Sequence, residues 1–183
     1  MSDKERELTG IPLQTRMLAE AFDEEVKIFY QSAECMPQLS FKLDLLWLYE
    51  RFIERKYDIY QEEKLQVSVS NAAAKEQRKY QLKSMRWGHQ LLASKMLFNE
   101  EQVALFQNNK ECSFSAEELT RIGIAQVSHD GKPHFIHRTF AEYYVADCLV
   151  NLLAEGNNTS EHLGAFIMED IFLKVYYQVI RVL

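Results

Sequence analysis

The feature that most constrains how this 183-residue chain folds is a turn sequence between two apolar runs. Asp130-Gly131 is flanked by residues 122–128 on one side and by residues 132–137 on the other. Glycine adopts positive φ without steric cost, so an Asp-Gly pair in this setting is the strongest short-range signal for a β-hairpin. We therefore predict that the chain reverses direction here and forms one hairpin.

A strongly apolar segment follows the hairpin directly. Thr139 and Glu142 have the spacing of a helix capping box, so we predict a helix that begins at Phe140, with His137 two residues before its N-cap. The first N–H groups of a helix carry partial positive charge and lack partners within the helix, so a histidine beside them is well placed to meet an anion. The alternative is that His137 is a polar corner residue bonded to backbone.

The remaining sequence predicts helices with few interruptions. The chain has only 6 Gly and 3 Pro, and 47% of its residues are hydrophobic, so we expect a mainly α fold with a sizeable core. Pro12 fits the first position of a helix, where its missing N–H would have no partner anyway. Apolar periodicity and capping signals place helices after Pro12, over 41–60 and 82–105, and after a Ser115–Glu118 capping box, with a further helix or helix pair over 163–183.

Aromatic residues recur at helical spacing in the segment after the hairpin. Such residues usually form core, so we predict that this stripe is buried and holds no cofactor. The buried stripe is expected to consist of Phe140, Tyr143, Tyr144 and Leu149.

Residues 61–80 are polar with small residues in the middle, which indicates a linker or a loosely packed helical connection. We place the linker at 66–80.

The charge balance disfavours two classes of partner. The net charge of −6 at pH 7 repels the phosphates of nucleic acids and anionic lipid surfaces, and no basic patch is evident. The longest apolar run, 143–154, is far shorter than the roughly 20 residues that a membrane span requires. Nucleic acid and membrane are therefore not expected as partners.

The cysteines indicate a reducing compartment. Cys35, Cys112 and Cys148 are odd in number, far apart and in no metal-binding or redox spacing, which suits free thiols. The N-terminus is polar where a signal peptide would have an apolar region. We expect a cytoplasmic protein.

Three histidines lie around the predicted hairpin, and their positions argue against a metal site. His129 belongs to the turn, while His134 and His137 are an odd number of residues apart and should point to opposite faces of a strand. Catalytic signatures are absent as well: the sequence has no phosphate loop, no paired acids after an apolar run and no nucleophile elbow. We expect no enzymatic activity from this chain alone.

A resemblance to a known family enters at residues 135–146. Their sequence, Phe-Ile-His-Arg-Thr-Phe-Ala-Glu-Tyr-Tyr-Val-Ala, resembles the Phe-x-His-x-Ser-Phe-x-Glu-Phe-x-Ala-Ala signature of the winged-helix domain in NACHT-type signalling ATPases, which include the NOD-like receptors. Thr139 stands where the signature has Ser, and Tyr143 and Tyr144 replace aromatic or small residues. In that family the signature histidine contacts the β-phosphate of bound ADP, so the resemblance assigns this role to His137.

A second motif lies near the N-terminus. Gly10-Ile11-Pro12-Leu13 resembles the Gly-x-Pro motif that opens the first helical domain of the same family, where the proline lies against the adenine ring. The local sequence also supports Pro12 as a plain helix starter. The resemblance implies a helical bundle followed by a winged-helix domain with one hairpin. Its expected parts are a helical domain (1–65), a linker (66–80), a winged-helix domain (81–155) and the start of a second helical domain (156–183).

The function that the resemblance implies is that of a sensor and lid for an upstream nucleotide-binding core in the same polypeptide. In the family this part closes over ADP, keeps the protein monomeric, and swings away when ATP replaces ADP so that subunits assemble. Innate immune or stress signalling is the expected setting. The apolar pattern still running at 179–183 suggests that further helices follow.

Two other functions remain open from the sequence. One is a stand-alone helical interaction module, in which the histidine motif is only packing. The other is a winged-helix nucleic-acid binder, which is disfavoured because residues 115–120, before the hairpin, carry two glutamates where a recognition helix needs basic or amide side chains.

Overall fold

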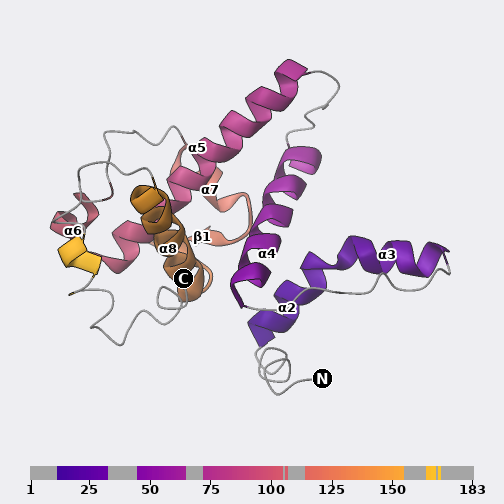
Figure 1. Ribbon diagram of the computed structural model, residues 1–183, viewed down its shortest axis with the longest axis horizontal. Helices are drawn as coiled ribbons and strands as arrows, with labels where there is room; N and C mark the ends of the chain where they lie inside the picture. The colour runs from indigo at the N-terminus through magenta and orange to yellow at the C-terminus, as the bar shows by residue number, and fades with distance from the viewer. Residues whose placement is uncertain are drawn as a thin grey trace. The chain divides into compact units, whose positions relative to one another are not determined.

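The computed structural model describes residues 12–32, 45–64, 72–104, 106, 114–154, 164–167 and 169. This described part is mainly helical and contains one two-stranded antiparallel hairpin, as the sequence predicts (Figure 1). The chain divides into two compact units, Met1–Ile59 and Tyr60–Leu183, which are described separately below.

The first unit contributes α2 (Pro12–Ala21), α3 (Asp23–Ser32) and α4 (Leu45–Ile59). Pro12 is the first residue of α2, as predicted. A turn at Phe22 separates α2 from α3, where the apolar pattern indicated a single helix. α2 packs against α4, and the side chains of Met17 and Leu48 are fully buried there. The first four residues of the predicted helix 41–60 lie outside the described residues.

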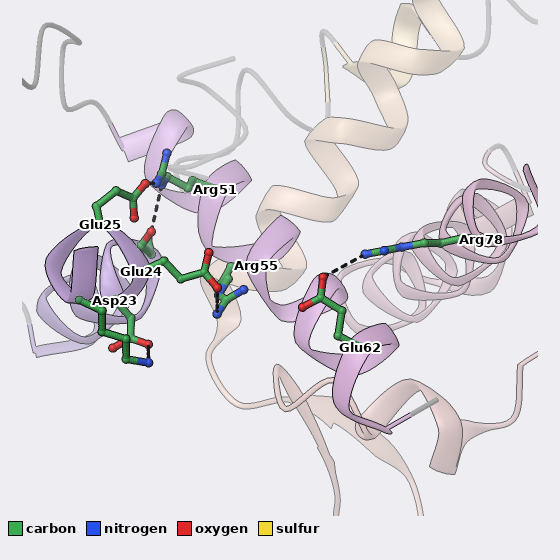
Figure 2. A network of polar contacts seen from close by, with 9 residues as sticks. Asp23, Glu24, Glu25, Arg51, Arg55, Glu62 and Arg78 are labelled. Atoms are coloured by element: carbon green, nitrogen blue, oxygen red, sulfur yellow. Dashed lines mark hydrogen bonds and ion pairs between the residues drawn. The ribbon is translucent and has the colours of Figure 1, made fainter. Parts of the chain in front are cut away.

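Ion pairs connect α4 to the two shorter helices of this unit. Arg51 pairs with Glu25, and Arg55 lies 2.7 Å from Glu24 (Figure 2). Arg51 also donates to the carbonyl of Ala21 at 3.0 Å. These side chains keep contact with water, so each pair contributes at most about 1 kcal/mol, and the apolar contact of α2 with α4 is the larger stabilising term.

The second unit begins with a π-helix, η1 (Tyr60–Lys64), and the long helix α5 (Ala72–Leu97). Gln61 in η1 donates to the carbonyl of Arg78 at 3.4 Å. Glu62 lies 3.8 Å from the Arg78 guanidinium (Figure 2). Within the segment 66–80, for which the sequence indicates a linker or a loosely packed helical connection, the residues from 72 onward are helical. Its composition of Ala, Lys, Glu, Gln and Arg favours a helix even without an apolar face.

Helix α5 passes through Gly88 without a break and ends at Leu97, followed by the short helix α6 (Glu100–Ala104). The sequence predicted one helix over 82–105. The break has a local cause, because the Asn99 side chain accepts from the backbone N–H of Gln102 at 2.9 Å. The Gln102 side chain accepts from the Asn99 backbone N–H at 3.2 Å in return. This reciprocal cap starts a new helix.

Helix α7 (Ala116–Thr120) and the hairpin come next. The predicted capping box is present, with Ser115 and Glu118 each accepting from the backbone N–H of the other. Strands β1 (Ala125–Val127) and β2 (Pro133–Phe135) pair with Gln126 opposite His134. Gly131 has φ of 77°, which explains why glycine occupies the turn. The predicted hairpin is confirmed.

The core of the second unit lies where α8 (Arg138–Ala154) meets α5. The predicted aromatic stripe is confirmed as core, since Phe140, Tyr143, Tyr144 and Leu149 are at most 5% exposed. Tyr144 stacks on Phe135 of the hairpin, with ring centroids 5.5 Å apart. The hairpin is therefore packed on the helices, which a marginal two-stranded sheet requires.

Two further predictions are tested only in part by the described residues. Cys148 is buried and is not part of a disulfide, while Cys35 and Cys112 lie outside the described residues. Within the predicted helix 163–183, only residues 164–167 and 169 are described, and they are helical. Among the described helices, none combines the length and the hydropathy that crossing a membrane would require.

Candidate functional site

The start of α8 differs from the predicted start and places His137 directly at the helix N-terminus. The helix begins at Arg138, and the backbone N–H of Thr139 donates to Nδ1 of His137 at 3.3 Å. His137 therefore occupies the N-cap position, where a side-chain acceptor satisfies a free N–H of the first turn.

The capping box predicted from Thr139 and Glu142 is wrong, as is the prediction that His137 lies two residues before the N-cap. Glu142 is only 4% exposed, and its carboxylate accepts instead from the Nε of Arg138 at 2.9 Å. Since the helical conformation extends back to Arg138, Thr139 is already inside the first turn and cannot cap it.

These contacts favour one tautomer of the His137 ring. Nδ1 accepts from the Thr139 backbone N–H and lies 2.8 Å from the Thr139 hydroxyl, which can also donate to it. A neutral imidazole has one acceptor nitrogen and one donor nitrogen, so the hydrogen-bond pattern assigns the proton to Nε2. The His137 side chain is exposed, and it presents an Nε2–H donor beside the N-terminus of a 17-residue helix.

The other two histidines near the hairpin have different surroundings. The Nε2 of His134 lies 2.9 Å from the side-chain amide of Gln126, the residue opposite it in the sheet, and the amide donates to the ring. His129 is exposed in the turn. His137 lies beyond the end of β2, so the alternation of strand faces does not apply to it, contrary to the sequence argument. In the described ranges no three ligating side chains gather as a metal site would need.

Pro12, the second predicted site residue, is exposed at the first position of α2. It belongs to the first unit and His137 to the second. Gly10 and Ile11, the rest of its motif, lie outside the described residues. The described structure thus supports the helix-starting role of Pro12 directly.

A polar network between α5 and α8 was missed by the sequence analysis. Arg86 donates to both oxygens of Asp147, from Nε and from Nη2, at 2.7 Å each. Gln90 donates to the same carboxylate at 2.7 Å, and Arg86 lies 3.4 Å from the Tyr143 hydroxyl. Partial burial acts to lower the pKa of Arg86, but the hydrogen bonds and charge of Asp147 outweigh it and raise that pKa. We call these four residues the α5–α8 clamp.

A buried histidine, His89, lies on α5 between the clamp residues Arg86 and Gln90. His89 is fully buried, with Nδ1 at 3.0 Å from the carbonyl of Met85 and Nε2 at 3.0 Å from the carbonyl of Leu119. Its ring stacks on Tyr144 with centroids 5.3 Å apart. Burial lowers the pKa of His89 to about 4, against the two carbonyl contacts, which raise it. His89 is therefore neutral near pH 7 and connects α5 with α7.

The exposed arrangement around His137 can recognise an anion. It offers an N–H donor beside the positive end of a helix dipole, a combination suited to one phosphate oxygen. Comparisons with protein-family models, with curated proteins and with solved structures give no match for this chain.

Proposed function

We propose that this chain is the nucleotide-state-sensing lid of a NACHT-type signalling ATPase, a part that holds the ADP-bound closed state. The observation that carries the proposal is the position of His137. Its Nε2–H donor is exposed at the N-cap of α8, within the 135–146 motif that resembles the family signature. Residues 140–146 of that motif are buried in α8, and their packing fixes this corner in place.

In the proposed mechanism, His137 donates its Nε2–H to an oxygen of the ADP β-phosphate. Thr139 keeps Nδ1 engaged as an acceptor, and this holds the ring in the donating tautomer. The N-terminus of α8 adds a favourable field for the negative charge. The donor set fits a phosphate oxygen, and Pro12 would contact the adenine ring. Phosphate-loop and magnesium-binding residues would come from an upstream core in the same polypeptide, so this chain itself is not an enzyme.

In the proposed architecture, α5, the short helices α6 and α7, the hairpin and α8 form a winged-helix domain, with the hairpin as its wing. The α2–α4 unit would be the preceding helical domain. Loss of the phosphate contact would release the lid and allow the parent protein to assemble in the cytoplasm, in innate immune or stress signalling.

A nucleic-acid-binding role receives no support from the geometry. The helix before the hairpin, α7, has only five residues, and Glu117 on it is 80% exposed. A recognition helix with an exposed carboxylate would be repelled by the phosphates of a duplex. The net charge of −6 acts in the same direction.

The test is the ADP affinity of the chain in one polypeptide with its upstream core. His137→Ala removes a hydrogen bond to a charged group, worth about 1.5 to 3 kcal/mol, and should weaken ADP binding roughly 10- to 150-fold. The control is His134→Ala, which removes a hairpin histidine whose ring bonds Gln126. Unchanged affinity in the His137 variant, or equal losses in both variants, would favour the stand-alone interaction module instead.

A further inference from the structure

Burial alone does not specify how α8 is rotated against its neighbours. All seven consecutive residues from Phe140 to Ala146 are buried, and successive residues of a helix point about 100° apart. Buried side chains therefore point in every direction around this part of α8. Six of these seven residues, all except Glu142, carry no charge, so the segment has no single apolar face that must turn inward, and hydrophobic burial tolerates more than one rotation.

The α5–α8 clamp specifies how α8 is rotated against α5. Asp147 receives two hydrogen bonds from the planar guanidinium of Arg86 and a third from Gln90. A bidentate Arg–carboxylate pair is satisfied only in a narrow range of orientations. The Asp147 side chain is only 15% exposed, so a rotation that broke these bonds would leave a carboxylate in apolar surroundings.

We propose that Arg86 and Asp147 act as positioning residues, which set the rotational and axial register of α8 on α5 and thereby place the His137 ring. α8 is unbroken from Arg138 to Ala154, so a change of register at Asp147 is carried to the N-cap. A slip of one residue turns the helix by about 100° and shifts it by about 1.5 Å. The Nε2–H of His137 would then point in a different direction. The consequence for nucleotide binding rests on the proposed function, whereas the register itself does not.

The test separates register from stability by replacing the pair with apolar residues. Buried ion pairs exchanged for well-packed apolar side chains often leave stability unchanged or raise it, while polar groups in a core are a known device for fixing register. In the full 183-residue chain we expect Arg86→Met combined with Asp147→Leu to remain folded. Its His137 imidazole should then show broadened or multiple ¹⁵N signals in place of the single set of the unsubstituted chain.

A matched pair of substitutions serves as the control. Glu117 and Arg121 form an exposed ion pair on α7, with side chains 80% and 53% exposed. Glu117→Leu combined with Arg121→Met should leave the His137 signals unchanged. Asp147→Asn, which keeps one acceptor for Arg86, should give an intermediate broadening.

Two results would overturn the inference. One is a single, unshifted set of His137 signals in the Arg86→Met/Asp147→Leu chain, because the register would then be set by packing. The other is loss of the fold in that chain, because the pair would then supply stability rather than register. Neither measurement contains nucleotide, so failure here is distinct from unchanged ADP affinity in His137→Ala, which tests the proposed function.

Discussion

The imidazole Nε2 of His89 lies 3.0 Å from the carbonyl oxygen of Leu119, and this buried contact joins the long helix α5 to α7. A neutral imidazole has one N–H, so it can donate to this carbonyl or to that of Met85, but not to both. The charged ring could donate to both carbonyls, yet burial disfavours the charge and lowers the pKa of His89 to about 4. The packing of the second unit therefore depends on a neutral histidine.

A pH dependence of stability follows from that pKa. The unfolded chain binds a proton at His89 near its ordinary pKa of 6.5, while the folded chain does so only near 4. The stabilisation that comes from keeping His89 neutral is fully present above pH 6.5. It is lost as the pH falls from 6.5 towards 4, which lowers the free energy of unfolding by roughly 3 kcal/mol. Urea unfolding at a series of pH values checks this.

The control for this prediction is His89→Gln, which keeps a side-chain N–H donor but does not titrate. Its unfolding free energy should change less between pH 6.5 and 5 than that of the unsubstituted chain. The pKa values of Glu20 and Glu118 are also lowered from 4.5, so these two groups change the stability only at pH values below about 4.5. Identical pH slopes for both chains above pH 5 would contradict the assignment to His89.

Breaking the α5–α8 clamp from one side should be costly. Asp147→Leu leaves the Arg86 guanidinium without its carboxylate in a partly buried site. Removing one partner of a fully buried ion pair costs about 3 to 5 kcal/mol. Because 36% of the Arg86 side chain reaches water, we expect a smaller loss of about 2 to 3 kcal/mol, measured by urea unfolding.

The comparison for this variant is Glu117→Leu, which breaks an ion pair whose carboxylate side chain is 80% exposed. Its unfolding free energy should change by no more than about 0.5 kcal/mol. Equal losses of unfolding free energy from Asp147→Leu and Glu117→Leu would show that burial of the clamp does not increase its contribution to stability.

The chain alone should not bind ADP or ATP tightly. One neutral N–H donor and a helix N-terminus hold one phosphate oxygen, whereas the sequence contains no phosphate loop for the remaining charge. Calorimetric titration of the 183-residue chain with each nucleotide is expected to give no binding in the micromolar range. A clear micromolar isotherm would contradict the proposal that the phosphate-holding residues come from an upstream core.

The sequence predicted those parts of the fold that depend on local chemistry. The hairpin turn needs positive φ at Gly131, and the cap of α7 needs a hydroxyl at Ser115 with a carboxylate three residues later. Both are encoded within a few residues. The buried aromatic stripe of α8 was predictable for the same reason, because its helical spacing is visible in one segment.

The errors come from competition between local signals and from contacts distant in sequence. Thr139 has the residue type of an N-cap, but the Nδ1 of His137 takes that role two residues earlier, and pattern rules that consider only oxygen acceptors miss an imidazole. Arg86 and Asp147 are 61 residues apart, so no periodicity links them. Residues 72–80 are helical, which is one of the two alternatives that their polar sequence left open, and their composition favours a helix.

The central claim is that His137 donates its Nε2–H to a phosphate oxygen of ADP, and the most direct measurement is nitrogen-15 NMR of this imidazole. The sample is the chain with its upstream core in one polypeptide, with and without ADP. We predict a protonated Nε2 in both states, with slowed exchange of its proton and a scalar coupling to phosphorus-31 when ADP is bound. An Nε2 signal with the same shift and proton exchange rate in both states would contradict the claim.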